Sequence, residues 1–121
     1  MAGSVNKAII VGHLGQDPEV RQSDDNLTIC KFSVATNQKR KGADGEYVDQ
    51  VEWHNIVCFD RLAQVCEQYL RRGSQVYVEG QIQTVRWETD GVKRNKTQIR
   101  ADKVEFLGGK GNDDNQRRQA F

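Results

Sequence analysis

The alternation of apolar and polar residues predicts β-strands along most of the first half of the chain. A short apolar run lies within Val5 to Val11, and turn-prone residues from Gly12 to Pro18 follow it, so we expect a first strand there. From Leu27 to Thr36, apolar side chains occupy every second position, which is typical of a half-buried strand. The same period returns from Val51 to Phe59. Between these two strands, the charged segment from Lys39 to Glu46 is predicted to be a solvated loop.

The period then changes to that of a helix. Apolar residues recur at helical spacing from Leu62 to Leu70, and Asp60 is a candidate cap at the start. Alternation resumes from Gln75 to Glu88, and an Asp-Gly pair at residues 90 and 91 predicts a hairpin turn. A returning strand is expected from Thr97 to Leu107.

Three strands, one helix and two strands follow the order of one known small barrel. In the five-stranded OB barrel, the helix lies between strands 3 and 4. We therefore expect an all-β fold, a five-stranded OB-fold barrel with one helix between strands 3 and 4, formed by residues 1–108. Another α+β arrangement of the same elements stays open. Residues 109–121 have almost nothing to bury and are predicted to be a disordered C-terminal tail.

Composition narrows the class of protein. The chain has 121 residues, of which 36% are hydrophobic and 29% charged, as expected for one soluble domain without a membrane span. The first residues lack the pattern of a secretory signal, so we expect a cytoplasmic location. The formal net charge is only +1, so any binding to nucleic acid must depend on local patches of charge.

The sequence offers little for catalysis or for a metal. The odd set of cysteines, Cys30, Cys58 and Cys66, contains no CxxC pair, and each falls within an apolar pattern, so we expect buried thiols. No nucleophile stands beside a histidine in a recognisable turn, and no glycine-rich phosphate loop or helical metal motif is present. We expect a protein that is not an enzyme and that uses no cofactor or metal.

Three aromatic residues are the first candidates for function. Trp53 and Phe59 are six residues apart on one predicted strand, which places both rings on the same face about 20 Å apart. Trp87 lies on the face of its strand opposite Val76 and Ile82, so it points outward if those two residues fill the core. The alternative is that these rings cover the open side of the barrel or a subunit contact.

Two loops next to these aromatics are basic. Five cations stand between residues 86 and 100 against two acidic residues, a local charge of +3: Arg86, Lys93, Arg94, Lys96 and Arg100 against Glu88 and Asp90. A second cluster, Lys39, Arg40 and Lys41, precedes Gly45. Basic loops beside outward aromatics fit a groove in which phosphates follow the cations and bases stack on the rings. Each loop alone is also explained as a solubilising hairpin tip.

The sequence closely resembles the bacterial single-stranded DNA-binding protein family. The matching stretches follow in order over nearly all of residues 4–108: VNKAIIVGHLGQDPEVR (Val5 to Arg21), FSVAT (Phe32 to Thr36), EWHNIVCF (Glu52 to Phe59), LAQVCEQYLRRGSQVYVEGQI (Leu62 to Ile82) and the pair Arg86-Trp87. The resemblance implies a homotetramer, a dimer of dimers, that binds single-stranded DNA with little sequence preference during replication, recombination and repair. The OB-fold of this family is an established example of stacking along a basic groove.

The resemblance also implies roles for individual residues. Trp53, Phe59 and Trp87 match base-stacking aromatics of the family, and Arg61, Arg72 and Arg86 match cations that contact phosphates. His54 matches a position at the monomer–monomer contact, and Gln75 and Tyr77 match positions where dimers meet. With the basic residues from the pattern, the candidate DNA-binding set is Trp53, Phe59, Trp87, Lys39, Arg40, Arg61, Arg72, Arg86, Lys93, Arg94 and Lys96.

The sequence departs from the family pattern in two places, which changes what we expect of base stacking and of partner recruitment. The family often has a further stacking Trp just after the FSVAT strand, where this chain has Asn37, Gln38, Lys39 and Arg40. We expect one platform to be missing, with Lys39 or Arg40 substituting by charge or by a guanidinium plane. The family typically ends in a linker and an acidic tip that recruits replication and repair proteins, whereas residues 109–121 are not acidic overall. Either the chain is truncated or this member lacks the tip.

Two alternatives of a different kind remain. One is a dimeric OB protein similar to the primosomal type, which binds DNA weakly and mainly contacts proteins. The other is an OB module used only for protein interaction. The native mass separates the first alternative from a tetramer, and the double substitution Trp53→Ala and Trp87→Ala tests the second.

Overall fold

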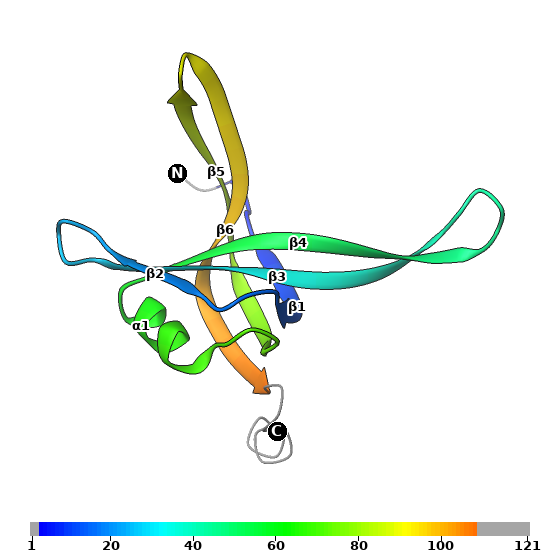
Figure 1. Ribbon diagram of the computed structural model, residues 1–121, viewed down its shortest axis with the longest axis horizontal. Coiled ribbons are helices and arrows are strands. Elements are labelled where there is room, and N and C mark those ends of the chain that lie inside the picture. Colours follow the sequence, from blue (N-terminus) through cyan, green and yellow to red (C-terminus); the bar gives the residue numbers. More distant parts are fainter. Residues whose placement is uncertain (1–2, 109–121) are drawn as a thin grey trace.

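The computed structural model describes residues 3–108. They form six strands and one helix, and Figure 1 shows two long hairpin arms that project from a small barrel. In chain order the elements are β1 (Ala8–Leu14), β2 (Glu19–Gln22), β3 (Thr28–Lys41), β4 (Tyr47–Phe59), α1 (Asp60–Tyr69), β5 (Gln75–Thr89) and β6 (Val92–Gly108).

Five of the strands close into a ring. Strand β1 pairs antiparallel with both β3 and β5, β5 pairs with β6, and β3 pairs with β4. A short parallel pairing of β4 with β6, at Ile56↔Ile99 and Val57↔Arg100, completes the ring. The helix follows the third ring strand in chain order and precedes the fourth. The predicted five-stranded barrel is therefore confirmed, with β2 as an additional short strand along β3.

The barrel closes where glycines let strands approach each other. A Cβ at Gly12 would collide with the carbonyl oxygen of Ala35, and one at Gly80 would collide with the carbonyl oxygen of Arg100. Gly12 belongs to β1 and Ala35 to β3, so the first contact lies next to the β1–β3 pairing that closes one side of the ring. Side chains at these two positions would push the closing strands apart.

The predicted loop from Lys39 to Glu46 is wrong over its first three residues, which belong to β3. The β3–β4 ladder continues outward to the pair Lys41↔Tyr47, so only residues 42–46 turn. Beyond the barrel both faces of this arm meet solvent, so its residues do not alternate between apolar and polar, and the pattern cannot reveal the ladder. The second arm, of β5 and β6, turns where predicted, because Asp90 and Gly91 both have positive φ (51° and 79°).

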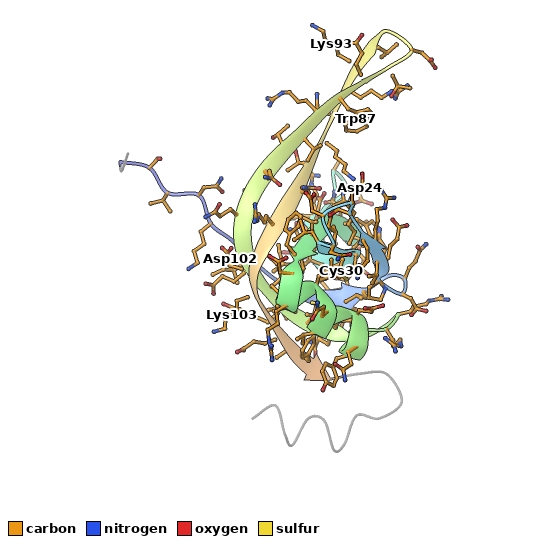
Figure 2. The ribbon with its side chains drawn as sticks, turned by 90° about the vertical axis from the view of Figure 1, so that its left-hand side faces the viewer. Asp24, Cys30, Trp87, Lys93, Asp102 and Lys103 are labelled. Atoms are coloured by element: carbon orange, nitrogen blue, oxygen red, sulfur yellow. The ribbon has the colours of Figure 1, made fainter. Side chains whose placement is uncertain are left out.

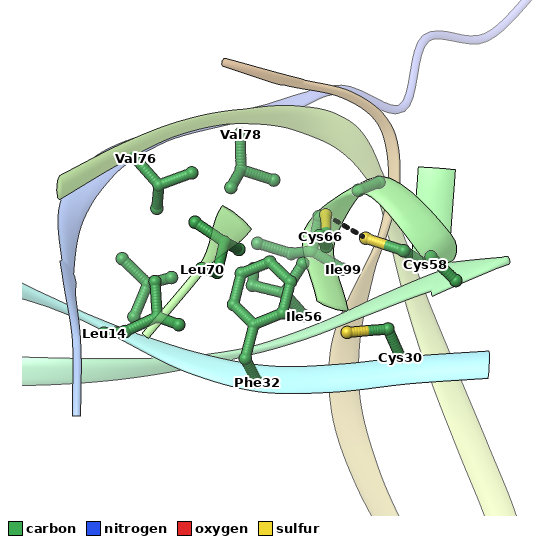
Figure 3. Close-up of a cluster of buried hydrophobic side chains, with 13 residues drawn as sticks. Leu14, Cys30, Phe32, Ile56, Cys58, Cys66, Leu70, Val76, Val78 and Ile99 are labelled. Carbon is green, nitrogen blue, oxygen red and sulfur yellow. Dashed lines mark hydrogen bonds between the residues drawn. The ribbon is translucent and has the colours of Figure 1, made fainter. Parts of the chain in front are cut away.

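The core lies inside the ring and under the helix, which closes one end of the barrel (Figure 3). Cys66 of α1 points to Cys58 of β4, with 3.8 Å between their sulfur atoms. The hydrogen bond to Cys66 and burial raise the pKa of the Cys58 thiol, and burial raises the pKa of Cys30 to about 12. The expectation of buried cysteines is confirmed. Asp60 is not the cap: Phe59 holds the N-cap position, with no capping side chain.

Candidate nucleic-acid interface

The register of β3 and β4 decides which aromatics face outward. Directly opposite residues of an antiparallel pair share a face, and the pair Phe32↔Ile56 lies in the core. Because side chains alternate along β4, Trp53 and Phe59 belong to the other, outer face, as predicted. That outer face of β3 and β4 carries the pairs Ala35↔Trp53, Ser33↔Asn55, Lys31↔Val57 and Ile29↔Phe59.

Trp53 lies against the end of β1 next to a glycine. Its side chain is 54% exposed, and a Cβ placed on Gly15 would come within 2.5 Å of the ring atom Cζ3. The edge of the ring at Cζ3 and Cη2 therefore lies against Gly15. This contact fixes one edge of the indole, and the exposed part of the ring is open to a ligand.

Phe59 is half-buried and already carries a cation on its ring. The guanidinium carbon of Arg100 lies 4.6 Å from the ring centroid, a distance typical of a cation–π contact. The parallel pair Val57↔Arg100 brings Arg100 to the outer face next to Phe59. The second face of this ring, or the guanidinium plane itself, is what a base can reach here.

A pocket of about 210 Å³ lies on the outer face around Asn55, which is between Trp53 and Phe59 along β4. We call it the central pocket. Its lining combines cations, amides and two carboxylates: Gln16, Asp17, Glu19, Lys31, Ser33, Asn55, Lys96 and Gln98, with Phe32 and Ile56. Glu19 lies directly across from Lys31. The Gln98 amide is buried and donates from Nε2 to Oε1 of Gln83 at 2.9 Å. Cations and amides thus stand between the two aromatic rings.

The register of β5 and β6 divides the basic cluster of the second arm between two faces. Trp87 lies opposite Arg94, and Lys96 two positions further along β6 shares this face. By the same alternation, Arg86 and Lys93 belong to the opposite face. Trp87 is 43% exposed, and Figure 2 shows it on the arm between the barrel and the tip, with Lys93 nearer the tip. A pocket of about 460 Å³ forms beside Trp87, lined by residues of both strands.

The core face of β5 is less buried than the pattern predicted. Val76 and Val78 are fully buried, but Ile82 is 50% exposed because the strand leaves the barrel there. Ile82 lines a pocket of about 330 Å³ at the open end of the barrel, together with Ile10 and Ile99.

The predicted cations of the first arm, Lys39 and Arg40, do not line the central pocket. Lys39 is on the Trp53 face of the first arm, and its Nζ lies 3.2 Å from Oδ1 of Asp49. Arg40 is on the opposite face, across from Val48.

The two arginines beside the helix are exposed. Arg61 is the second residue of α1 and follows closely after Phe59. Arg72 follows the helix, and its backbone N–H donates to Oδ1 of Asp17 at 2.8 Å. Because Asp17 lines the central pocket, this bond holds the Arg72 segment near that pocket.

The three predicted interface residues lie elsewhere. His54 points inward and its Nε2 is 2.9 Å from Oγ1 of Thr36, at the pocket of the open end. Gln75 and Tyr77 lie on β5, where they pair with β1. The Tyr77 hydroxyl donates to Oε1 of Glu79 at 2.8 Å.

Glu79 also binds Lys7, the residue that precedes β1. Lys7 lies 2.9 Å from its Oε2, and the hydrogen bonds from Lys7 and Tyr77 hold the pKa of the Glu79 carboxyl below its usual value. The outer face of β1 beside this network exposes two large apolar residues, Ile9 and Val11, which are 56% and 46% exposed.

Sequence reasoning missed four residues of the outer face: Lys31, Asn55, Gln98 and Gly15. Asn55 could have been found, because it lies two residues after Trp53 and four before Phe59, an even spacing that puts it on the same face. Lys31 and Gln98 come from other strands, and only the register brings them to the same pocket. Arg100 was counted as a local charge, but its contact with Phe59 has no signal in the sequence.

No helix within residues 3–108 is long and apolar enough to cross a membrane. Within the same residues, no three His, Cys, Asp or Glu side chains are grouped so that they could hold a metal ion.

Comparison with known proteins gives consistent matches in sequence. The model of the Single-strand binding protein family matches residues 5–107. A single-stranded DNA-binding protein of Neisseria meningitidis is 42% identical over 108 residues, covering 88% of this chain and 62% of that protein. Single-stranded DNA-binding protein 1 of Chlorobaculum tepidum is 39% identical over 112 residues, covering 91% of this chain and 69% of that protein. The chain thus spans somewhat less than two thirds of the length of the Neisseria relative.

Solved structures agree in fold. A Plasmodium falciparum SSB in complex with single-stranded DNA superimposes with a TM-score of 0.82 at 28% identity, covering 88% of this chain and 98% of that one. A deletion mutant of the single-stranded DNA binding protein from Thermus aquaticus gives a TM-score of 0.77 at 26% identity, covering 89% of this chain and 53% of that one.

Proposed function

Because this chain belongs to the single-strand binding protein family, we propose that it binds single-stranded DNA without catalysis and with little sequence preference. The observation that carries the proposal is the outer face of the barrel, where Trp53 and Phe59 stand on one strand with Lys31 and Lys96 at the pocket between them. Rings stack on any base, and cations follow the phosphates, so such a face binds without reading sequence. In the cell this activity protects single strands during replication, recombination and repair.

We propose a path for the bound DNA strand over this face. Bases stack on Trp53 and on the Phe59–Arg100 pair, while phosphates between them meet Lys31 and Lys96. The path continues onto the second arm, where Trp87 shares a face with Lys96. Arg94, opposite Trp87, lies on this path, and Lys39 lies on the Trp53 face. The other predicted cations contribute further positive charge: Arg40, Arg61, Arg72, Arg86 and Lys93.

We also propose the assembly that the family resemblance implies, a homotetramer built as a dimer of dimers. His54 lies at one contact, and Gln75 and Tyr77 lie at the other. The exposed apolar side chains Ile9 and Val11 on β1 support a contact between copies, because this flank pairs with Tyr77 and is separate from the central pocket. We place its action in the cytoplasm, associated with the nucleoid. Replication and repair proteins are candidate partners, although residues 109–121 do not carry the acidic tip by which the family recruits them.

The test is a titration of the protein with oligo-dT while tryptophan fluorescence is followed. We expect quenching, and an affinity that falls as salt rises because bound cations release counterions from the phosphates. Trp53→Ala should weaken binding at every salt concentration. Absence of quenching at low salt would refute DNA binding by these rings.

Native mass with and without a long dT oligomer tests the assembly. A tetramer that binds the oligomer supports the proposal. A dimer with weak binding favours the primosomal type. Unchanged DNA binding in the double variant Trp53→Ala and Trp87→Ala leaves only a role in protein interaction.

A further inference from the structure

Another exposed aromatic residue, Tyr47, continues the row of rings on β4. Tyr47, Trp53 and Phe59 follow one another at intervals of six residues, so all three belong to the same face of the strand, about 20 Å apart. Tyr47 is the first residue of β4, near the tip of the first arm, and its side chain is 68% exposed. Figure 1 shows β4 running from the barrel into the first arm, so the row follows the strand outward.

Within residues 3–108, no aromatic or cation–π contact involves the Tyr47 ring. The cross-strand neighbour of Tyr47 is Lys41. Tyr69 is a useful contrast, since it is 61% exposed but packs against Phe106 with 5.6 Å between ring centroids. An aromatic ring with no such contact at an arm tip is free to stack on a ligand.

The neighbouring residues on this face suit a nucleic acid. The cross-strand pairs on the Tyr47 face are Lys41↔Tyr47, Lys39↔Asp49, Asn37↔Val51 and Ala35↔Trp53. Asp49, the one acidic residue among them, is paired with Lys39, so it repels phosphate less. Val51 is 48% exposed and continues the apolar surface from Tyr47 to Trp53. The face therefore carries ring, apolar and cationic groups in one line.

We propose that Tyr47 is an additional base-stacking platform, which carries single-stranded DNA from Trp53 outward along the first arm. The proposal rests on the DNA-binding function proposed above and extends it to an arm where Lys39 and Arg40 were the expected substitutes for a ring. A tyrosine face stacks on any base as the other rings do, so the platform lengthens the bound segment without adding sequence preference.

The experiment compares Tyr47→Ala, Tyr47→Phe and Val48→Ala in the full chain, with affinity for dT oligomers of increasing length measured by tryptophan quenching. Val48 is the matched control, because it lies on the same arm with its side chain on the opposite face. With long oligomers, Tyr47→Ala should weaken binding about fivefold or more, whereas Tyr47→Phe and Val48→Ala should bind as the unchanged protein does. With oligomers just long enough to quench the tryptophans, all four proteins should bind alike.

The possible outcomes separate the two proposals. Equal affinity of Tyr47→Ala and the unchanged protein for long oligomers overturns the Tyr47 platform while DNA binding stands. An equal loss in Tyr47→Phe overturns stacking by the ring, and an equal loss in Val48→Ala shows that the arm as a whole was damaged, which also overturns it. If the unchanged protein does not bind dT, the proposed function itself fails.

Discussion

The contact between Gly15 and Trp53 allows the Trp53 platform to be moved without altering any residue that touches DNA. In Gly15→Ala the new Cβ would come within 2.5 Å of Cζ3, whereas ordinary contacts lie at 3.4–4 Å. The indole must therefore shift by about 1 Å, the difference between these contact distances. Because Trp53 is 54% exposed, it can move toward solvent, so the fold should tolerate the substitution.

The loss of affinity follows from the size of the shift. Stacking on an aromatic is worth about 1–3 kcal/mol per base, and a gap of 0.5–1 Å forfeits about a quarter to a half of a dispersion contact. Gly15→Ala should therefore cost about 0.5–1.5 kcal/mol, or roughly a 2- to 12-fold weaker affinity for dT.

A double-mutant cycle tests whether Gly15→Ala weakens DNA binding through Trp53. Affinities are measured for Gly15→Ala, Trp53→Ala and the double variant, with thermal unfolding as a control for the fold. Because Gly15 acts only through the ring, Gly15→Ala should have no further effect once Trp53 is replaced. Additive losses, or a large drop in Tm, would refute the reasoning that Gly15 positions Trp53.

Three further predictions address closure, charge and burial. Gly80→Ala should lower the free energy of unfolding by about 1–3 kcal/mol in urea titrations, because its Cβ collides with a backbone carbonyl; an unchanged urea midpoint would contradict this. Lys96→Ala should reduce the slope of log affinity against log salt by about 1, and Lys93→Ala should reduce it less, since Lys93 lies on the other face of the arm. Equal slopes in the two variants would contradict the conclusion that only the Lys96 face contacts the phosphates. Burial raises the pKa of Cys30 from 9.0 to about 12, so the unfolded thiol ionises first and stability should fall as pH rises through this interval. Urea unfolding between pH 8 and 11 should show a smaller fall in Cys30→Ala than in the unchanged protein.

The sequence predicted the barrel well because apolar and polar residues alternate along the core strands, whereas apolar residues recur at helical spacing in the helix. Each of these elements buries one face, and burial imposes the period that the sequence shows. The first arm was mistaken for a loop for the same reason. Beyond the barrel nothing is buried, so the paired strand residues from Lys39 to Lys41 left no apolar pattern to find.

The candidate site was predictable only strand by strand. Even spacing was sufficient to place Trp53 and Phe59 on one face, because side chains alternate strictly along a strand. Spacing was not sufficient for the second arm, where the cations were counted together as one local cluster. The register with β6 then placed Lys96 with Trp87, and Lys93 on the other side.

The sequence by itself determined the five barrel strands, the helix, their order and the faces of single strands, since these depend on local period and turn residues. Only the tertiary structure decided which strands meet, because the register depends on closure of the whole ring. That closure brings Lys31, Lys96 and Gln98 to the same pocket and Arg100 onto the ring of Phe59. It also places Trp53 against Gly15, from the start of the chain. Contacts between residues so far apart in sequence have no period of their own, and the physical reason is that they form only when the barrel closes.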